Sequence, residues 1–272
     1  MILDGRDSAS YWEARAQPYL GGREEWRAVT VEAPPAVARR HMRFEERGVR
    51  VLERHLPRAG RVLDAGCGVG RWFPLTAPGR RLTGMDFSPP LLERARATGR
   101  GVEVLLGDVR EIPAPNAAFD AAYTVKVLQC LKTEERHLAV AELFRVTARG
   151  GVVVLFEKTR GGDGSPAREW LRWAEQAGGR LVEWHANGFA LLDRAIASLL
   201  ALARKSTRPH APRSSVGVAE GQISLAERRP RVHAAYMGIH ALALGASFAA
   251  EPIAERVLPR SWAEHGIFVF TK

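Results

Sequence analysis

The sequence predicts an α/β fold in which helices cover both faces of an open, doubly wound sheet. Short apolar runs alternate with longer helical patterns from about residue 49 onward, and this alternation is typical of parallel strands joined by helices. The run Gly151–Glu157 has an apolar centre without alternation, as expected of a strand buried between two helical layers. A glycine-rich turn follows the first apolar run, and ligands bind at that end of such sheets.

The individual elements follow from local patterns in chain order. An amphipathic helix is predicted for Ala36–His55, because the residue before Pro57 disfavours helical backbone. Apolar runs bounded by turn residues predict seven strands, and several of the longer stretches between them predict helices. The predicted strands are Arg61–Ala65, Arg80–Asp86, Val102–Leu106, Phe119–Val125, Gly151–Glu157, Arg180–His185 and Gly266–Thr271, and the further predicted helices are Pro89–Thr98, Thr133–Thr147 and Pro166–Ala177.

The alternation stops between His185 and Gly266, where two Ala/Leu-rich helical stretches follow. They are Phe189–Lys205 and Val232–Ala250, joined by a basic linker. Charged or histidine side chains interrupt both, so neither has the roughly 18 apolar residues of a membrane span. We expect a helical insertion or cap with buried helices; a homodimer interface or a membrane-surface contact is the alternative. The expected divisions are an N-terminal helical arm or lid (1–48), a core (49–185), the insertion (186–264) and a closing strand (265–272).

The composition limits the function classes. The chain has 272 residues with 40 Lys+Arg against 30 Asp+Glu, a formal net charge of +10. A basic balance suits nucleic acid, but acidic residues interrupt the arginine-rich stretches, so we expect nucleic acid not to be the partner. Two cysteines are too few for a disulfide scaffold or a four-ligand zinc site, and no metal is expected. The N-terminus has no apolar run after a basic start, which predicts a cytoplasmic protein.

The segment Val62–Arg71 carries the most specific signal. An apolar strand runs into a turn with three glycines, where bare backbone can approach a ligand at the start of the next helix. A dinucleotide-binding fingerprint would require glycine at position 71, which is arginine. The charge of Asp64 at the mouth of the turn would repel a pyrophosphate but suit an ammonium group. The turn is therefore predicted to hold a cationic amino-acid moiety.

Two further aspartates follow the next two predicted strands. Asp86 ends the second strand and is placed to accept two ribose hydroxyls, while Asp108, after the third, can accept from an adenine amino group. Any one of the three aspartates alone could be a turn or helix-cap residue. Together with the glycine turn, they predict a ligand made of adenosine, ribose and an amino acid.

These motifs, in this order and spacing, resemble the class I S-adenosylmethionine-dependent methyltransferases of the small-molecule type found in bacterial quinone and natural-product pathways. The resemblance runs from about Val49 to Glu157 and includes the closing strand Gly266–Thr271. It implies a Rossmann-like sheet of seven strands with the last one antiparallel, S-adenosylmethionine as cofactor and S-adenosylhomocysteine as product. The cofactor residues it implies are Asp64, Gly66, Cys67, Gly68 and Gly70 around the methionine part, Asp86 at the ribose, Phe87, Asp108 and Val109 at the adenine, Thr124, Val125 and Lys126 near the sulfonium, and Tyr11 in a lid.

The chain differs from the family at one position where many relatives carry a histidine that can act as a base. Many relatives carry Glu-His where this chain has Gln129-Cys130, so a histidine base at that place is missing. The remaining candidates for a base are His233 and His240, which share one face of a predicted helix, and His41. The alternative, which we favour for His233 and His240, is that they are partly exposed histidines of a core helix without a catalytic role, and His41 is the lesser candidate.

Two other features have alternative interpretations. The aromatic side chains of the N-terminal arm can form a lid over the cofactor or simply pack the arm; they are Tyr11, Trp12, Tyr19 and Trp26. Glu157 can face the site, or it can cap a helix or pair with Lys158.

The resemblance implies methyl transfer to a small organic acceptor, and the apolar insertion suggests an acceptor that is bulky and partly apolar. Two alternatives stay open. The first is an RNA or tRNA methyltransferase. The second is a protein of the same fold that uses the cofactor without methyl transfer, as a cyclase or a binding module.

Overall fold

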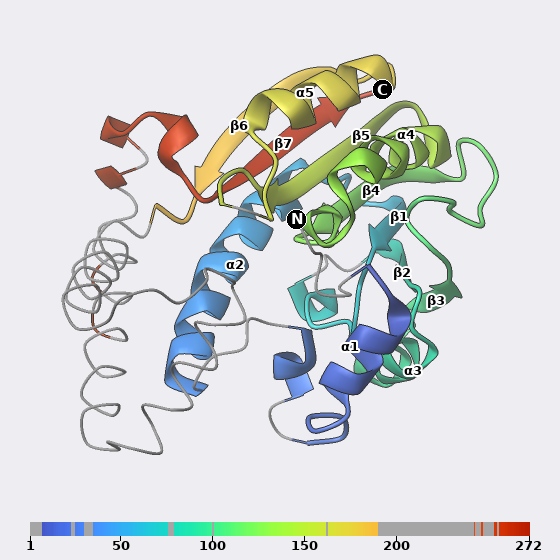
Figure 1. Ribbon diagram of the computed structural model, residues 1–272. Helices are drawn as coiled ribbons and strands as arrows, with labels where there is room; N and C mark the ends of the chain where they lie inside the picture. Colours follow the sequence, from blue (N-terminus) through green and yellow to red (C-terminus); the bar gives the residue numbers. More distant parts are fainter. Residues whose placement is uncertain are drawn as a thin grey trace.

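Seven strands form one mixed sheet in the computed structural model of the chain (Figure 1). The structure describes residues 7–22, 25–29, 35–75, 79–99, 101–161, 163–189, 242, 246, 253–254 and 256–272. The strand order is β3-β2-β1-β4-β5-β7-β6. The strands are β1 (Gly60–Ala65), β2 (Arg80–Asp86), β3 (Glu103–Leu106), β4 (Phe119–Val125), β5 (Thr147–Lys158), β6 (Arg180–Asn187) and β7 (His265–Thr271).

The sheet has the predicted doubly wound topology. β1 pairs in parallel with β2 and β4, β2 with β3, and β4 with β5. β7 is antiparallel to both of its neighbours, β5 and β6. The predicted fold class, with its antiparallel last strand, is therefore confirmed. Since β1 pairs with β2 on one side and β4 on the other, the winding reverses between β1 and β4, and doubly wound sheets open a ligand site at that point.

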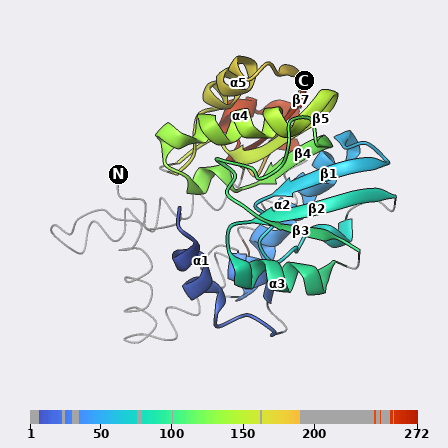
Figure 2. The same cartoon turned by 90° about the vertical axis from the view of Figure 1, so that its right-hand side faces the viewer.

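Helices cover both faces of the sheet (Figure 2). On one face, α4 (Arg136–Val146) and α5 (Ala167–Gln176) bury large side chains such as Phe144 and Trp170 against the strands. On the other, α2 (Pro35–His55) and α3 (Pro89–Thr98) contribute Leu52 and Leu92 to a second apolar cluster. The central strands are thus buried on both sides, which explains their continuous apolar runs.

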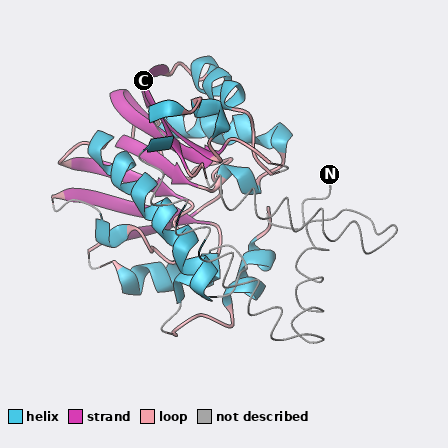
Figure 3. Cartoon of the chain, turned by 90° about the vertical axis from the view of Figure 1, so that its left-hand side faces the viewer, coloured by secondary structure: helices cyan, strands magenta, loops and turns pink. Residues whose placement is uncertain are grey.

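The long helix α2 lies across one face of the sheet (Figure 3). Val49 and Leu52 are buried along it, one helical turn apart, and Leu56 is buried directly after its last residue. Gly48 faces Phe156 of β5 so closely that an added Cβ would lie 2.4 Å from the ring. The absence of a side chain at this position lets α2 pack directly on β5. The helix is continuous from residue 35 to residue 55, so the division that we place after residue 48 falls within it.

The N-terminal arm contains α1 (Ala9–Ala16) and the 3-10 helix η1 (Glu25–Val29). The Ser8 hydroxyl caps α1 by accepting a hydrogen bond from the backbone N–H of Tyr11 (3.4 Å). Ala16 and Ala28 form a small apolar cluster with Val69 and Leu91. This cluster joins the arm to the glycine turn and to α3, at the carboxyl ends of the first strands.

Two predicted helices need correction. The helix expected directly after the glycine turn is not found in the described residues there, where Phe73–Leu75 form a single 3-10 turn, η2. The helix predicted for Thr133–Thr147 begins as a 3-10 turn, η4 (Thr133–Glu135), and its α-helical part ends at Val146. It ends there because Thr147 already has extended backbone and pairs with Phe119 of β4.

The predicted helical insertion lies largely outside the described residues. Of Phe189–Lys205 and Val232–Ala250, the structure describes only Phe189 and residues 242 and 246. Near its end, the 3-10 helix η5 (Arg260–Trp262) leads into β7. No helix within the described part of the chain is long and apolar enough to cross a membrane.

The contact between α2 and β5 predicts the effect of one methyl group. Gly48→Ala should lower the free energy of unfolding by about 1–3 kcal/mol, the usual cost of overpacking, although alanine has the higher helix propensity. Thermal unfolding measures the change. Arg50→Ala is the matched control, because Arg50 is exposed and its ion pair with Glu46 on the helix surface contributes little. A stabilised Gly48→Ala protein would contradict the close packing.

Candidate active site

The carboxyl ends of β1, β2 and β4 open into a cavity of about 400 Å³. Small-molecule sites have volumes of roughly 300–1,000 Å³, so the cavity has the size of a cofactor site. The loops after β1 to β4, the arm and α2 form its walls. The predicted site residues that line it are Tyr11, Asp64, Gly66, Cys67, Gly68, Asp86, Phe87, Asp108, Val109, Val125 and Lys126.

The glycine turn after β1 forms one wall in left-handed backbone. Gly66 has φ +84° and Gly68 has φ +56°, conformations that residues with a side chain rarely adopt. The backbone N–H groups of Gly66 and Cys67 both donate to the carbonyl of Met85 in β2, at 2.7 and 2.8 Å. A Cβ on Gly68 would lie 2.8 Å from the Val29 side chain of the arm. The turn is therefore pinned to β2 and leaves its backbone bare toward the cavity.

Two buried carboxylates, Asp64 and Asp86, lie beside this turn. Burial raises the pKa of Asp64 to about 7; the nearby charge of Asp86 adds to the effect, and a hydrogen bond from Tyr123 opposes it. Burial also raises the pKa of Asp86 to about 6, against hydrogen bonds from backbone N–H groups. Those of Gly68 and Ser88 donate to Asp86 at 2.9 and 3.1 Å. Both carboxylates are thus held in place but only partly compensated.

Asp108 has a partner that the sequence interpretation missed. The Arg110 side chain donates to both carboxylate oxygens of Asp108, at 3.0 and 2.6 Å, and also to Glu135 at 2.8 Å. Although burial raises the pKa of Asp108, the hydrogen bonds from Arg110 outweigh it and lower the pKa overall. Asp108 is therefore a fixed, charged acceptor at the cavity wall.

A third buried carboxylate, Glu45 of α2, lies between two cations. The Lys126 ammonium lies 2.7 Å from Glu45 Oε1, and an Arg71 guanidinium nitrogen lies 2.7 Å from Oε2. Burial raises the pKa of Glu45, but the two cations outweigh it and lower the pKa to about 2.

The backbone of Lys126 is also unusual. Lys126 has φ +61°, and its N–H donates to the Phe156 carbonyl at 2.7 Å. Such strained backbone at a residue other than glycine is common at functional sites.

The loop after Lys126 is held from behind by two buried charged side chains. The Glu157 carboxylate accepts from the backbone N–H groups of Val127, Leu128 and Gln129 at 3.1–3.2 Å. Glu157 therefore caps the 3-10 helix η3 (Leu128–Cys130), which settles its role in favour of capping. The Arg136 guanidinium donates to the carbonyls of Leu131 and Gln129 at 3.2 and 3.0 Å.

The N-terminal arm contributes residues to the wall of the cavity. Tyr11 and Trp12 of α1 both line it, and their rings meet edge to face with centroids 5.3 Å apart. The arm is tied down by a contact between Glu13 and Ser88 (3.3 Å) and by the ion pair of Glu25 with Arg94. Of the other two predicted lid residues, Tyr19 packs in the apolar cluster of the arm, and Trp26 is half-buried without lining the cavity.

The remaining predicted residues are not brought into the cavity. Gly70 and Thr124 are buried behind its wall. His41 lies in a small adjoining pocket that shares Glu45 and Lys126 with the cavity. His233 and His240 lie outside the described residues.

Sequence comparisons identify the region around the cavity. A family described as "Methyltransferase domain" matches residues 63–155. A malonyl-acyl-carrier-protein O-methyltransferase of Serratia marcescens is 38% identical over 94 residues, which are 34% of this chain and 36% of that protein. A tRNA (carboxymethyluridine(34)-5-O)-methyltransferase of Arabidopsis thaliana is 39% identical over 101 residues, 37% of this chain and 24% of that protein.

Structural comparison agrees on the fold. The crystal structure of the (4+2)-cyclase SpnF matches with a TM-score of 0.51 and 21% sequence identity, over 84% of this chain and 80% of that chain. The chain spans less than two thirds of the length of the first curated relatives that it matches. The matched region runs from β1 into β5 and contains the glycine turn and all three aspartates. Residues 63–155 therefore match the methyltransferase domain family, on a sheet with the fold of the class I, S-adenosylmethionine-dependent methyltransferases.

Proposed function

We propose that the protein transfers a methyl group from S-adenosylmethionine to a small organic acceptor. The observation that carries this proposal is the pair of buried carboxylates, Asp64 and Asp86, beside a bare glycine turn in a cavity of cofactor size. A buried carboxylate is costly without a partner. A ligand with an ammonium group and a pair of hydroxyls supplies partners to both.

For each part of the cofactor, the cavity has residues of matching chemistry. Asp64 and the turn Gly66–Gly68 suit its amino-acid part, and Asp86 suits the ribose. Phe87 and Val109 offer apolar surface for the adenine, with the charged Asp108 at its edge. The carboxylate of Asp64 thus lies where the ligand has its ammonium group, so the charges of the cavity fit the implied cofactor.

When bound, the cofactor supplies an electrophilic methyl group on a sulfonium. The protein's own residues then align the acceptor and exclude water, and orientation of bound reactants can lower a barrier by roughly 7–11 kcal/mol. Tyr11 and Trp12 of the arm line the cavity. The loop after Lys126 is held in place by Glu157 and Arg136, and we expect it to contact the acceptor.

An acceptor that must lose a proton needs a base. Glu45 is unsuited, because its two cations hold its pKa at about 2. His41 lies next to Glu45 and Lys126 in the adjoining pocket, so it is our candidate among the described histidines. His233 and His240 stay predictions from the sequence.

Methylation of tRNA is a second candidate, because one relative that matches this region is a tRNA methyltransferase. Against it, a carrier-protein methyltransferase matches the same region at nearly the same identity, and the arm contributes residues to the wall of the cavity. We therefore prefer a small acceptor.

The proposed role of Asp64 predicts a variant that is stable but binds the cofactor product weakly. Asp64→Asn should weaken S-adenosylhomocysteine binding by about 100-fold, since a hydrogen bond to a charged group contributes about 1.5–3 kcal/mol. Calorimetric titration measures the affinity. The ligand-free variant should melt at or above the wild-type temperature near neutral pH, because the uncharged amide removes a desolvated charge.

Glu103→Gln is the matched control for Asp64→Asn, because Glu103 is an exposed acid on the edge strand β3. It should bind like the wild type. Unchanged binding by a folded Asp64→Asn protein would contradict the role given to Asp64.

The reaction class is tested by the fate of an isotopically labelled methyl group. Wild-type protein is incubated with methyl-labelled S-adenosylmethionine and pools of small acceptors, and products are weighed by mass spectrometry. We expect the label on a small molecule, with loss of product in Asp64→Asn. Label found only in added tRNA would favour the second candidate, and a rearranged, unlabelled product with intact cofactor would indicate a cyclase.

A further inference from the structure

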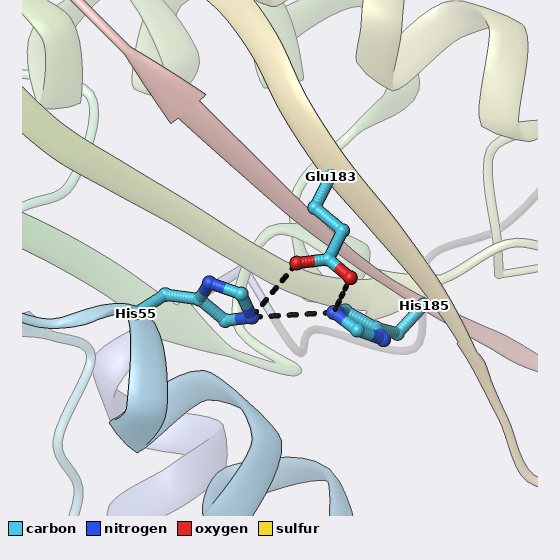
Figure 4. A group of neighbouring side chains, drawn as sticks. All are labelled: His55, Glu183 and His185. Carbon is cyan, nitrogen blue, oxygen red and sulfur yellow. Dashed lines mark hydrogen bonds and ion pairs between the residues drawn. The ribbon is translucent and has the colours of Figure 1, made fainter.

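A cluster of side chains that could bind a metal ion lies between α2 and the edge strand β6 (Figure 4). None of its members lines the cavity. His55 is the last residue of α2, while Glu183 and His185 come from β6. The two histidines are 130 positions apart in the sequence, so only the fold brings them together.

The three side chains direct their ligand atoms to a common point. The Nε2 atoms of His55 and His185 are 3.2 Å apart. A Glu183 oxygen lies 3.1 Å from His185 Nε2, and its other oxygen lies 3.5 Å from His55 Nε2. Zinc binds imidazole nitrogen and carboxylate oxygen at about 2.0–2.2 Å in tetrahedral geometry, which places neighbouring ligand atoms about 3.3–3.6 Å apart. The two contacts of His185 Nε2 are close to this spacing, and with one atom taken from each residue all three ligand atoms lie within 4.8 Å of one another.

The fold holds these side chains in place before any ligand binds. Glu183 and His185 are two residues apart on a strand and therefore share one face, the face toward α2 (Figure 4). β6 is hydrogen-bonded along its length to β7, with His185 opposite Ile267. The Asn187 side chain donates to the Phe44 carbonyl at 3.0 Å and ties α2 to β6. Such preorganisation lowers the cost of binding an ion.

Hydrogen bonding alone satisfies this cluster poorly. The His185 Nε2 faces both the other imidazole nitrogen and the carboxylate, yet a neutral imidazole has at most one proton to share there. An ion at the common point would be bound by both nitrogens and the carboxylate at once. Two imidazoles and one carboxylate select borderline transition metals over Mg²⁺ and Ca²⁺, which prefer oxygen ligands.

We propose that His55, Glu183 and His185 bind one divalent transition-metal ion of the zinc type, with a fourth position for water. The ion would connect the end of α2 to the outermost strand of the sheet. The Glu183 side chain is 46% exposed and that of His185 is 32% exposed, so the ion can enter from solution. This site is independent of the proposed methyl transfer.

The experiment uses the full chain without an affinity tag, after treatment with a chelator. Calorimetric titration with Zn²⁺ should show one site per chain. Titration with Co²⁺ should produce the visible absorption of a low-coordinate site, which Zn²⁺ then displaces. Zn²⁺ should also raise the melting temperature, since an ion that binds only the folded state stabilises it.

Two variants test the assigned ligands. His185→Gln and Glu183→Gln should each weaken Zn²⁺ binding by about 100-fold or more, since even an outer-shell partner contributes roughly 10–100-fold. His137→Gln is the matched control, because His137 is exposed and outside the cluster. Without added metal, both ligand variants should melt near the wild-type temperature, which shows that they are folded. Absence of saturable Zn²⁺ binding by the wild type, or equal binding by all three variants, would overturn the proposal.

Discussion

The arrangement of the site depends on one costly feature, two carboxylates buried side by side at the ends of β1 and β2. Burial alone would favour their protonated forms, and both Asp64 and Asp86 have raised pKa values. The surrounding backbone holds them in position: the glycine turn is pinned to Met85, and two N–H groups donate to Asp86. Because Asp64 binds its proton more tightly in the folded chain, the ligand-free protein loses stability as pH rises from about 4 to about 7.

Glu45 shows how two cations in direct contact change the pKa of a buried carboxylate. Asp64 and Glu45 are both buried, yet their pKa values shift in opposite directions, to about 7 and about 2. The difference lies in their partners: Glu45 has Arg71 and Lys126 in direct contact, whereas Asp64 has a tyrosine and another carboxylate nearby. We interpret the Glu45 cluster as structural support that joins α2 to β4. Asp64 and Asp86 are only partly compensated, so a cationic ligand can recover part of the cost of burying them when it binds.

Local patterns were sufficient to predict the sheet and the anionic side of the site. Buried strands have apolar runs whatever their neighbours, so β2 and β4 agree with their predicted bounds, and the aspartates follow directly at strand ends. Residues that act through distant partners left no such signal. Glu45 and Arg71 look like ordinary charged residues of a helix surface and a turn, and Arg110 and Arg136 acquire their roles only when loops meet. The histidines of α2 and β6 are likewise brought together only by the register of β6. The helix α1 is weakly amphipathic, and its contact with the glycine turn involves residues far apart in the sequence.

The central claim is that Asp64 is a desolvated carboxylate that binds a cationic ligand. Titrating that residue tests this claim most directly. Carbon NMR of protein labelled at its aspartate carboxyl carbons, assigned with Asp64→Asn, gives its pKa with and without S-adenosylhomocysteine. We predict a pKa of about 7 in the free protein. With ligand, it should fall to between about 4 and about 6, since a nearby opposite charge lowers a carboxyl pKa by roughly 1–3. A pKa near the ordinary value of about 4 in the free protein, or one that the ligand leaves unchanged, would contradict the account.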